Sequence, residues 1–188
     1  LDAAVAATVE RFGGIDVLVA DAGFGVSGNM LRLQTDDYRR QFETNVFGVI
    51  DSVYAMLPHL IARKGRIGLL GSVMGHVGMP ASAPYCASKF AVTGFAESVQ
   101  YDLAEKGVSV TLISPGLVAS EIRSVNNAGA FTGKSDPAPA FLVMPVDRAA
   151  RQMVQALYRR RPILVVTLHG KLAVFINRYF PRFTRLFF

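Results

Sequence analysis

The sequence predicts an α/β domain in which helices cover both faces of a parallel sheet. The first observation is that segments with helical periodicity alternate along the chain with short apolar runs. The second is composition: 51% of the 188 residues are hydrophobic and 18% are charged, which suits strands buried on both faces. The length suits one domain with a sizeable core. The single cysteine excludes an internal disulfide and suits a reducing compartment.

The elements of the first half follow from periodicity and from their end signals. Residues 1–12 are rich in alanine, carry apolar side chains on one face and stop at Gly13-Gly14, so they predict a helix. Residues 15–20 are a short apolar run and predict a strand. Thr35, which two aspartates follow, is expected to cap a helix that runs to about residue 62 and bends near Pro58.

The second half repeats this alternation. Apolar runs predict strands, amphipathic runs predict helices, and a stretch with several prolines predicts a loop. Strands are expected at residues 66–71, 108–114 and 163–167, and helices at 82–106, 119–125, 146–160 and from Gly170 onward with a break at Pro181. Residues 117–145 are otherwise irregular, and long loops of this kind in a domain are usually functional or mobile.

Polar or turn-forming residues follow three of the predicted strands. Asp21, Ser72 and Pro115 each come directly after an apolar run. The carboxyl ends of parallel strands meet at one edge of a sheet, and ligands bind at that edge in doubly wound folds. These three positions therefore predict a ligand site.

A tyrosine and a lysine lie on one face of the predicted helix 82–106. Tyr85 and Lys89 are four residues apart, so their side chains are neighbours. Ser72 lies 13 residues before Tyr85, and Asn45 lies in the preceding helix. Taken singly, these residues are more simply a packing tyrosine, a solvated lysine, a turn serine and a capping asparagine. Taken together they predict acid–base chemistry, because a lysine ammonium beside a phenol favours the phenolate and lowers the pKa of the phenol.

This set of residues resembles the catalytic tetrad of the short-chain dehydrogenase/reductase family. The resemblance implies that Tyr85 is the acid–base residue and that Ser72 binds the substrate oxygen. It implies that Lys89 holds the nicotinamide ribose and that Asn45 holds a water in the proton relay. It further implies a Rossmann-like doubly wound sheet and an NAD(P)-dependent oxidoreductase that interconverts an alcohol and a ketone or aldehyde.

Other segments match the family's cofactor-binding motifs with changes. The family's Asn-Ala-Gly appears as Asp21-Ala22-Gly23, where the aspartate keeps acceptors but loses the amide donor; its plainer role is to pin the sheet. The family's threonine after Pro115-Gly116 is matched by Ser120, which alternatively caps the short helix. The resemblance implies cofactor contacts at Asp21, Ala22, Gly23, Tyr85, Lys89, Pro115, Gly116, Val118 and Ser120. NAD or NADP is expected, with NADP slightly preferred. No metal site is expected, since the histidines lack ligand spacing.

The resemblance covers nearly all of this chain but only the later part of the family's domain. That domain begins with a strand, a Gly-rich turn and a helix that bind pyrophosphate, and the sequence holds no such turn. Residues 1–168 are therefore expected to be an incomplete, N-terminally truncated Rossmann-like domain from a longer protein, with strand 15–20 as an exposed apolar edge. The alternative is a non-catalytic scaffold or interaction protein on a truncated fold.

The irregular segment 117–145 lies where the family has its substrate lid. It carries several apolar side chains, at Phe131, Phe141, Leu142, Val143 and Met144. They favour an apolar alcohol or ketone of lipid-like, steroid-like or retinoid-like character. The alternative is that they pack on the domain.

Charge is distributed unevenly along the chain. Residues 1–147 carry 11 basic and 14 acidic side chains, whereas residues 148–188 carry nine basic and no acidic ones. In the basic aromatic tail 169–188, apolar residues alternate with arginines, at Leu172, Phe175, Ile176, Tyr179, Phe180 and Phe183 and at Arg178, Arg182 and Arg185. This pattern favours peripheral membrane contact over nucleic acid, with an oligomer interface or packing in the core as alternatives. A cytoplasmic or peripherally membrane-associated homo-oligomer with no nucleic-acid partner is expected.

Overall fold

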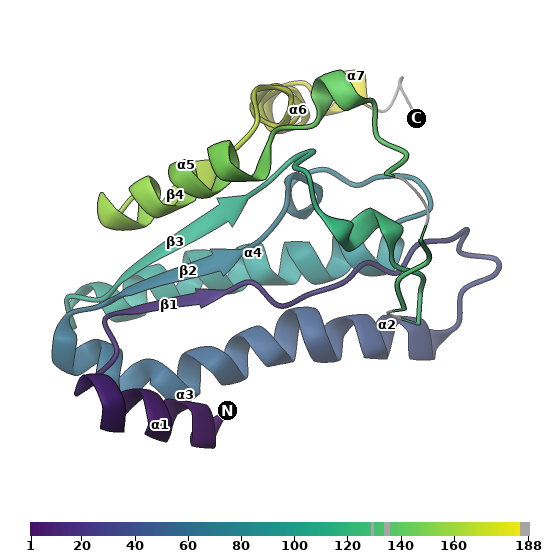
Figure 1. The fold of residues 1–188 in the computed structure, drawn as a ribbon. Coiled ribbons are helices and arrows are strands. Elements are labelled where there is room, and N and C mark those ends of the chain that lie inside the picture. Colours follow the sequence, from purple (N-terminus) through teal and green to yellow (C-terminus); the bar gives the residue numbers. More distant parts are fainter. Residues whose placement is uncertain (129, 134–135, 185–188) are drawn as a thin grey trace.

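A parallel sheet of four strands, in the order β1-β2-β3-β4, runs through the part of the chain that the structure describes (Figure 1). The structure is a computed structural model and describes residues 1–128, 130–133 and 136–184. The strands are β1 (Val17–Ala20), β2 (Arg66–Leu70), β3 (Ser109–Ser114) and β4 (Ile163–Val165). Their register pairs Ala20 with Leu69, Leu70 with Ile113, and Ser114 with Val165. The carboxyl ends of all four strands therefore meet at one edge, as the sequence predicted.

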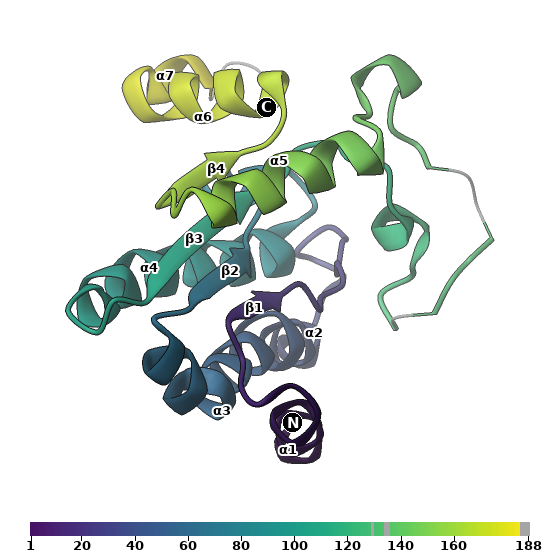
Figure 2. The ribbon, with the colours of Figure 1, turned by 60° about the vertical axis from the view of Figure 1, so that its left-hand side comes forward.

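Helices cover both faces of this sheet (Figures 1 and 2). The helices α1 (Asp2–Phe12), α3 (Gly48–Arg63) and α4 (Ala83–Ala104) lie on one face, and α5 (Val146–Tyr158) lies on the other. A first group of buried apolar side chains fills the space between the sheet and α1, α3 and α4, with Leu60, Ile67 and Leu112 at its centre. A second, smaller group around Ile113 and Leu157 joins the sheet to α5. The predicted α/β class and its Rossmann-like arrangement are confirmed.

The long helix predicted from Thr35 is present but contains an irregular turn. It consists of α2 (Thr35–Phe42), a π-helical turn η1 (Glu43–Phe47) and α3, and Pro58 lies inside α3. The capping residue is Gln34 rather than the predicted Thr35, since the backbone N–H of Gln34 donates to Asp37 Oδ2 at 2.9 Å. A π-helical turn widens the helix locally and often marks a functional position. Here it contains Asn45, which is fully buried.

By length and composition alone, the continuous helix Thr35–Arg63 is apolar enough to cross a membrane. Its packing explains the apolar composition differently. α3 contacts β1 and β2, and Val49, Val53 and Leu60 are buried in the core. We therefore interpret it as a core helix.

The short helix predicted at 119–125 is present as the 3₁₀ helix η3 (Glu121–Ser124). A further 3₁₀ helix, η4 (Ala140–Leu142), lies later in the same segment, and another, η2 (Val73–Gly75), follows β2. The rest of the segment 117–145 is irregular where the structure describes it, as predicted, and in Figure 2 it extends beyond the carboxyl ends of the strands.

The edge strand and the C-terminal helices complete the fold. Val17 and Val19 of β1 are 46% and 50% exposed, so β1 is the expected apolar edge of the described sheet. After β4 come α6 (Leu168–Tyr179) and α7 (Pro181–Thr184). The predicted boundary between residues 168 and 169 falls within α6, whose side chains contact β4 and η2. Arg185, predicted as part of the basic tail, lies outside the described residues.

Candidate active site

Ser72 and Tyr85 meet at the carboxyl end of β2. Ser72 caps η2, and its Oγ accepts a hydrogen bond from the backbone N–H of Met74 at 3.1 Å. The Ser72 side chain is near enough to the Tyr85 hydroxyl to lower the pKa of Tyr85 as a hydrogen-bond partner. The position of η2 depends on Gly75, because a Cβ at that residue would lie 2.6 Å from the carbonyl oxygen of Lys89. This close approach holds η2, and with it the serine loop, against α4.

Lys89 lies one helical turn after Tyr85 and is buried, with 5% of its surface exposed. Its Nζ donates to the carbonyl oxygen of Leu70 at 2.6 Å and lies 5.7 Å from the centre of the Tyr85 ring. Burial lowers the pKa of Lys89 to about 8, and the negative charge of Asp21 offsets part of that effect. Lys89 is therefore largely charged at neutral pH but titrates far more easily than an exposed lysine.

The pKa of Tyr85 departs from the predicted direction. We expected the lysine to lower it, but burial raises the pKa of Tyr85 above 10, and the hydrogen bond from Ser72 and the charge of Arg123 offset this only in part. The physical reason is the environment of the phenol, which disfavours the charged phenolate. In addition, the Lys89 ammonium lies beside the Tyr85 ring and donates its hydrogen bond to the Leu70 carbonyl.

Asn45 fixes the loop that follows β1. Its Oδ1 accepts from the backbone N–H of Phe24 at 3.1 Å, and its Nδ2 donates to the Phe24 carbonyl at 3.0 Å and to Ser88 Oγ at 3.3 Å. These bonds use both N–H groups of the amide and leave acceptor capacity on Oδ1. Asn45 thus joins the loop to α4 within one turn of Tyr85 and Lys89.

The Asp21-Ala22-Gly23 segment lies at the mouth of the site. Asp21 and Ala22 are exposed, and the Asp21 carboxylate acts on Lys89 through its charge. A Cβ at Gly23 would lie 3.0 Å from Asn45 Oδ1, so the glycine permits the close approach of loop and amide. The structure therefore gives Asp21 an electrostatic link to Lys89.

The loop after β3 runs beside the serine loop. The Pro115 carbonyl accepts from the Val73 N–H at 2.9 Å, and Gly116 is packed closely against residues that follow β4. Val118 pairs with Met144, whereas Ser120 is exposed at the start of η3 and makes no capping hydrogen bond through its side chain. The structure thus brings Pro115 close to the serine loop, whereas Ser120 lies exposed within the irregular segment.

The family of this chain follows from its sequence as a whole. A sequence model described as short chain dehydrogenase matches residues 1–131. That match covers most of the chain and includes all four residues of the predicted tetrad. The chain belongs to the short-chain dehydrogenase family.

Individual relatives agree with this assignment. The chain is 32% identical over 180 residues to a dehydrogenase/reductase SDR family protein 7-like of Anopheles gambiae, covering 94% of this chain and 57% of the relative. It is 33% identical over 141 residues to a 3-ketodihydrosphingosine reductase of Bacteroides thetaiotaomicron, covering 74% of this chain and 52% of the relative. The chain thus spans about half the length of the curated relatives that it matches.

Solved structures show the same fold. An alcohol dehydrogenase from Thermococcus sibiricus, complexed with 5-hydroxy-NADP, superposes with a TM-score of 0.73 at 22% identity, over 88% of this chain and 68% of that one. A gluconate 5-dehydrogenase from Burkholderia cenocepacia, in complex with NADP and tartrate, gives a TM-score of 0.61 at 31% identity, over 65% of this chain and 48% of that one.

Several polar residues near this candidate site were not predicted. Gln41 is fully buried, and its side chain bonds the backbone of Val26 at 2.6 Å and of Phe24 at 2.7 Å, beside Asn45. Its position four residues before Asn45, which puts both amides on one face of the predicted helix, is the signal that would have indicated it. No local signal marks the ion pair of Arg123 with Asp136, in which Arg123 Nε lies 2.7 Å from Asp136 Oδ1.

Two further sets of hydrogen bonds, made by Arg123 and Asn127, fix the irregular segment near the candidate site. Arg123 also donates to the Val118 carbonyl at 2.9 Å. The side chain of Asn127 bonds both backbone groups of Ser27, at 2.9 and 2.7 Å. These contacts hold the segment after β3 against the loop after β1. Met144 packs against the second apolar group, as the alternative for this residue predicted, whereas Phe131 and Phe141 are exposed.

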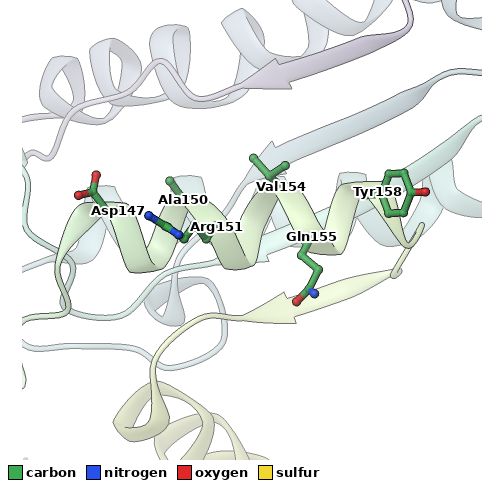
Figure 3. Close-up of a pocket in the computed structure, with 6 residues that line it drawn as sticks. All are labelled: Asp147, Ala150, Arg151, Val154, Gln155 and Tyr158. Carbon is green, nitrogen blue, oxygen red and sulfur yellow. The ribbon is translucent and has the colours of Figure 1, made fainter.

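Two surface hollows among the described residues lie away from this site. One lies along the outer face of α5, where Asp147, Arg151, Val154 and Tyr158 line it (Figure 3). Another is formed by residues 179–183. Neither contains a tetrad residue, so the site is identified by its chemistry and its position at the sheet edge rather than by its shape.

Proposed function

We propose that this chain carries the catalytic centre of an NAD(P)-dependent oxidoreductase that interconverts an alcohol and a ketone or aldehyde. The observation that supports this most strongly is the buried ammonium of Lys89 one helical turn from Tyr85, 5.7 Å from the centre of its ring, with Ser72 near enough to affect the pKa of the phenol. Family membership supports the same chemistry.

The residues present suit a nicotinamide cofactor. Lys89 has three N–H donors, and its bond to Leu70 uses one, so it would hold the ribose hydroxyls. The backbone of Pro115, Gly116 and Val118, with the Ser120 hydroxyl, would hold the nicotinamide end. The Asp21–Gly23 loop would lie toward the adenosine half. NADP is the preferred form, because the gluconate 5-dehydrogenase at 31% identity is complexed with it. When bound, the cofactor supplies or accepts the hydride.

The protein side chains carry out the proton transfer of the proposed reaction. In carbonyl reduction, the Tyr85 hydroxyl gives its proton to the substrate oxygen, and the Ser72 hydroxyl donates a hydrogen bond that holds that oxygen. The partly buried phenol is a poor base by itself, because desolvation raises its pKa. The positive charge of Lys89 favours the phenolate that forms after proton transfer. Asn45 keeps its loop and α4 in register and has Oδ1 capacity for a water in the proton relay.

The test is Tyr85→Phe in the complete protein, assayed with NADPH and a ketone panel. Loss of turnover by about 10²-fold or more is expected, since this removes the acid–base group. Tyr101→Phe is the matched control, because Tyr101 lies on the same helix and is 81% exposed. Equal activity of the Tyr85 variant and the control would reject the assignment.

An apolar, lipid-like ketone or alcohol is the proposed substrate class. Phe141 and Phe131 are 86% and 63% exposed on the segment that borders the site, and a relative at 33% identity is a 3-ketodihydrosphingosine reductase. We expect kcat/KM to rise with the alkyl length of the ketone and Phe141→Ser to flatten that rise. Phe12→Ser, an exposed change on α1, is the control. A flat profile in the wild-type protein would contradict an apolar substrate.

The outer face of α6 supports peripheral contact with an anionic membrane. Leu168, Leu172, Phe175 and Tyr179 recur at helical spacing and are all exposed, whereas the predicted contact residue Ile176 is only partly exposed. Lys171, Arg178 and Arg182 flank this stripe, and residues 148–188 carry no acidic side chain. Flotation with anionic vesicles should carry the protein upward more than flotation with neutral vesicles. Equal recovery in the bottom fraction with both would exclude this contact.

A further inference from the structure

His169 lies on the first turn of α6 and touches the loop that follows β3. Its Nε2 accepts a hydrogen bond from the backbone N–H of Leu117 at 3.1 Å, although 52 residues separate the two in sequence. The fit around this contact is close. A Cβ at Gly116 would lie 2.8 Å from His169 Nε2 and 2.3 Å from Thr167 Oγ1. The imidazole and the hydroxyl therefore pack directly against the loop backbone.

Thr167 holds this imidazole in place. It is buried, caps α6 by accepting from the Gly170 N–H at 3.2 Å, and its Oγ1 lies 3.1 Å from His169 Nε2. A nitrogen that accepts from Leu117 must carry a lone pair, so the neutral imidazole with its proton on Nδ1 is assigned from the hydrogen-bond network. The side chain thus presents one acceptor in a fixed direction.

The loop that follows β3 makes two other backbone hydrogen bonds besides the one to His169 Nε2. The Pro115 carbonyl bonds the serine loop through the Val73 N–H at 2.9 Å. The Leu117 carbonyl accepts from the Met144 N–H at 2.9 Å and so bonds the irregular segment. The Leu117 N–H, on the other side of that residue's backbone, donates to His169 Nε2. The loop is therefore fixed between three elements, of which α6 is one.

We propose that His169 is a positioning residue that sets the Pro115–Leu117 backbone for the nicotinamide end of the cofactor. The proposal rests on the proposed function, since that function assigns cofactor contacts to Pro115 and Gly116, which precede Leu117, and to Val118, which follows it. His169 acts through Leu117 and is not itself assigned a contact with cofactor or substrate.

The test compares His169→Gln with His169→Asn in the complete protein. The Gln Oε1 can occupy the place of Nε2, whereas the Asn Oδ1 corresponds to Nδ1 and cannot reach Leu117. Both variants stay polar, which limits differences in folding. Two quantities are measured: the exchange rate of the Leu117 amide by NMR, without cofactor, and the dissociation constant of NADPH by fluorescence.

We expect the Leu117 amide to exchange about fivefold faster in His169→Asn than in the wild type, as for the loss of one ordinary hydrogen bond, with NADPH bound more weakly by a similar factor. His169→Gln should retain both values. Asn177→Ala is the control, since it removes another α6 contact, the 2.9 Å bond to the His76 carbonyl, and should leave Leu117 exchange unchanged.

Several outcomes would overturn the proposal: wild-type exchange in His169→Asn, equally fast exchange in the Gln variant or the Asn177 control, or faster exchange with unchanged NADPH affinity. Absence of NADPH binding to the wild-type protein would instead reject the proposed function, and with it the cofactor role of His169. The exchange rates would then still decide whether His169 fixes the loop.

Discussion

Replacement of Lys89 by methionine removes an ammonium group that the fold buries beside Tyr85. Burial lowers the pKa of Lys89 from 10.5 to about 8. Because one pKa unit corresponds to about 1.36 kcal/mol, this difference is worth about 3 kcal/mol in the free energy of unfolding. Between these two values the folded protein has released the proton while the unfolded chain still holds it. The unfolded state then binds more protons, so stability should rise with pH across this window.

The assay is urea unfolding of wild type and Lys89→Met at several pH values between about 7 and 10. The variant leaves the Leu70 carbonyl without its 2.6 Å partner, which changes its stability by an amount that does not depend on pH. The diagnostic quantity is therefore the free energy of unfolding of the wild type minus that of the variant. This difference should increase by about 2–3 kcal/mol as pH rises. Tyr85, whose raised pKa acts in the opposite sense above pH 10, is common to both proteins. Parallel stability curves would refute the depressed lysine pKa.

Three further predictions follow from the contacts around the site. Asn45→Ala removes the bonds to Phe24 and should lower the free energy of unfolding by about 2–4 kcal/mol in denaturant titrations; a loss below about 0.5 kcal/mol would contradict the pinning role. Gly75→Ala should cost about 1–3 kcal/mol and reduce turnover by displacing η2, whereas Gly78→Ala, which meets no atom within 4 Å, should be nearly neutral; equal effects would contradict the close packing of η2 on α4. The hydrogen bond from Arg123 lowers the pKa of Asp136 from 3.8 to about 2, so the ionised carboxylate stabilises its loop above that range. Asp136→Asn should therefore be more sensitive to protease than the wild type at neutral pH, and this difference should disappear as pH falls toward 2. A difference that persists at that pH would contradict it.

Local pattern was enough to predict much of this molecule. The four strands and the helices from 1–12, 82–106 and 146–160 appear within a few residues of their predicted bounds, because apolar periodicity reports directly which face of an element is buried. The spacing of Tyr85 and Lys89 placed them on one helical turn. The rule that strand ends converge placed Ser72 beside them.

Other features depended on contacts between distant segments. The π-helical turn at Glu43–Phe47 has no sequence signal, since it depends on how Asn45 meets Phe24 and Ser88. The raised pKa of Tyr85 was predicted in the wrong direction, because a neighbouring charge can be read from spacing but the depth of burial cannot.

The sequence by itself determined the class of fold and the edge of the sheet at which the candidate site lies, because these follow from periods of two and 3.6 residues and from chain order. The roles of Ser72, Tyr85 and Lys89 follow from their resemblance to a family motif and stay predictions. Only the tertiary structure decided how the site is held: the bond of Leu117 to His169, the pair of Arg123 and Asp136, and the burial of Lys89. Each of these joins segments far apart along the chain or depends on such packing. Their geometry and desolvation exist only once the sheet and its helices have assembled.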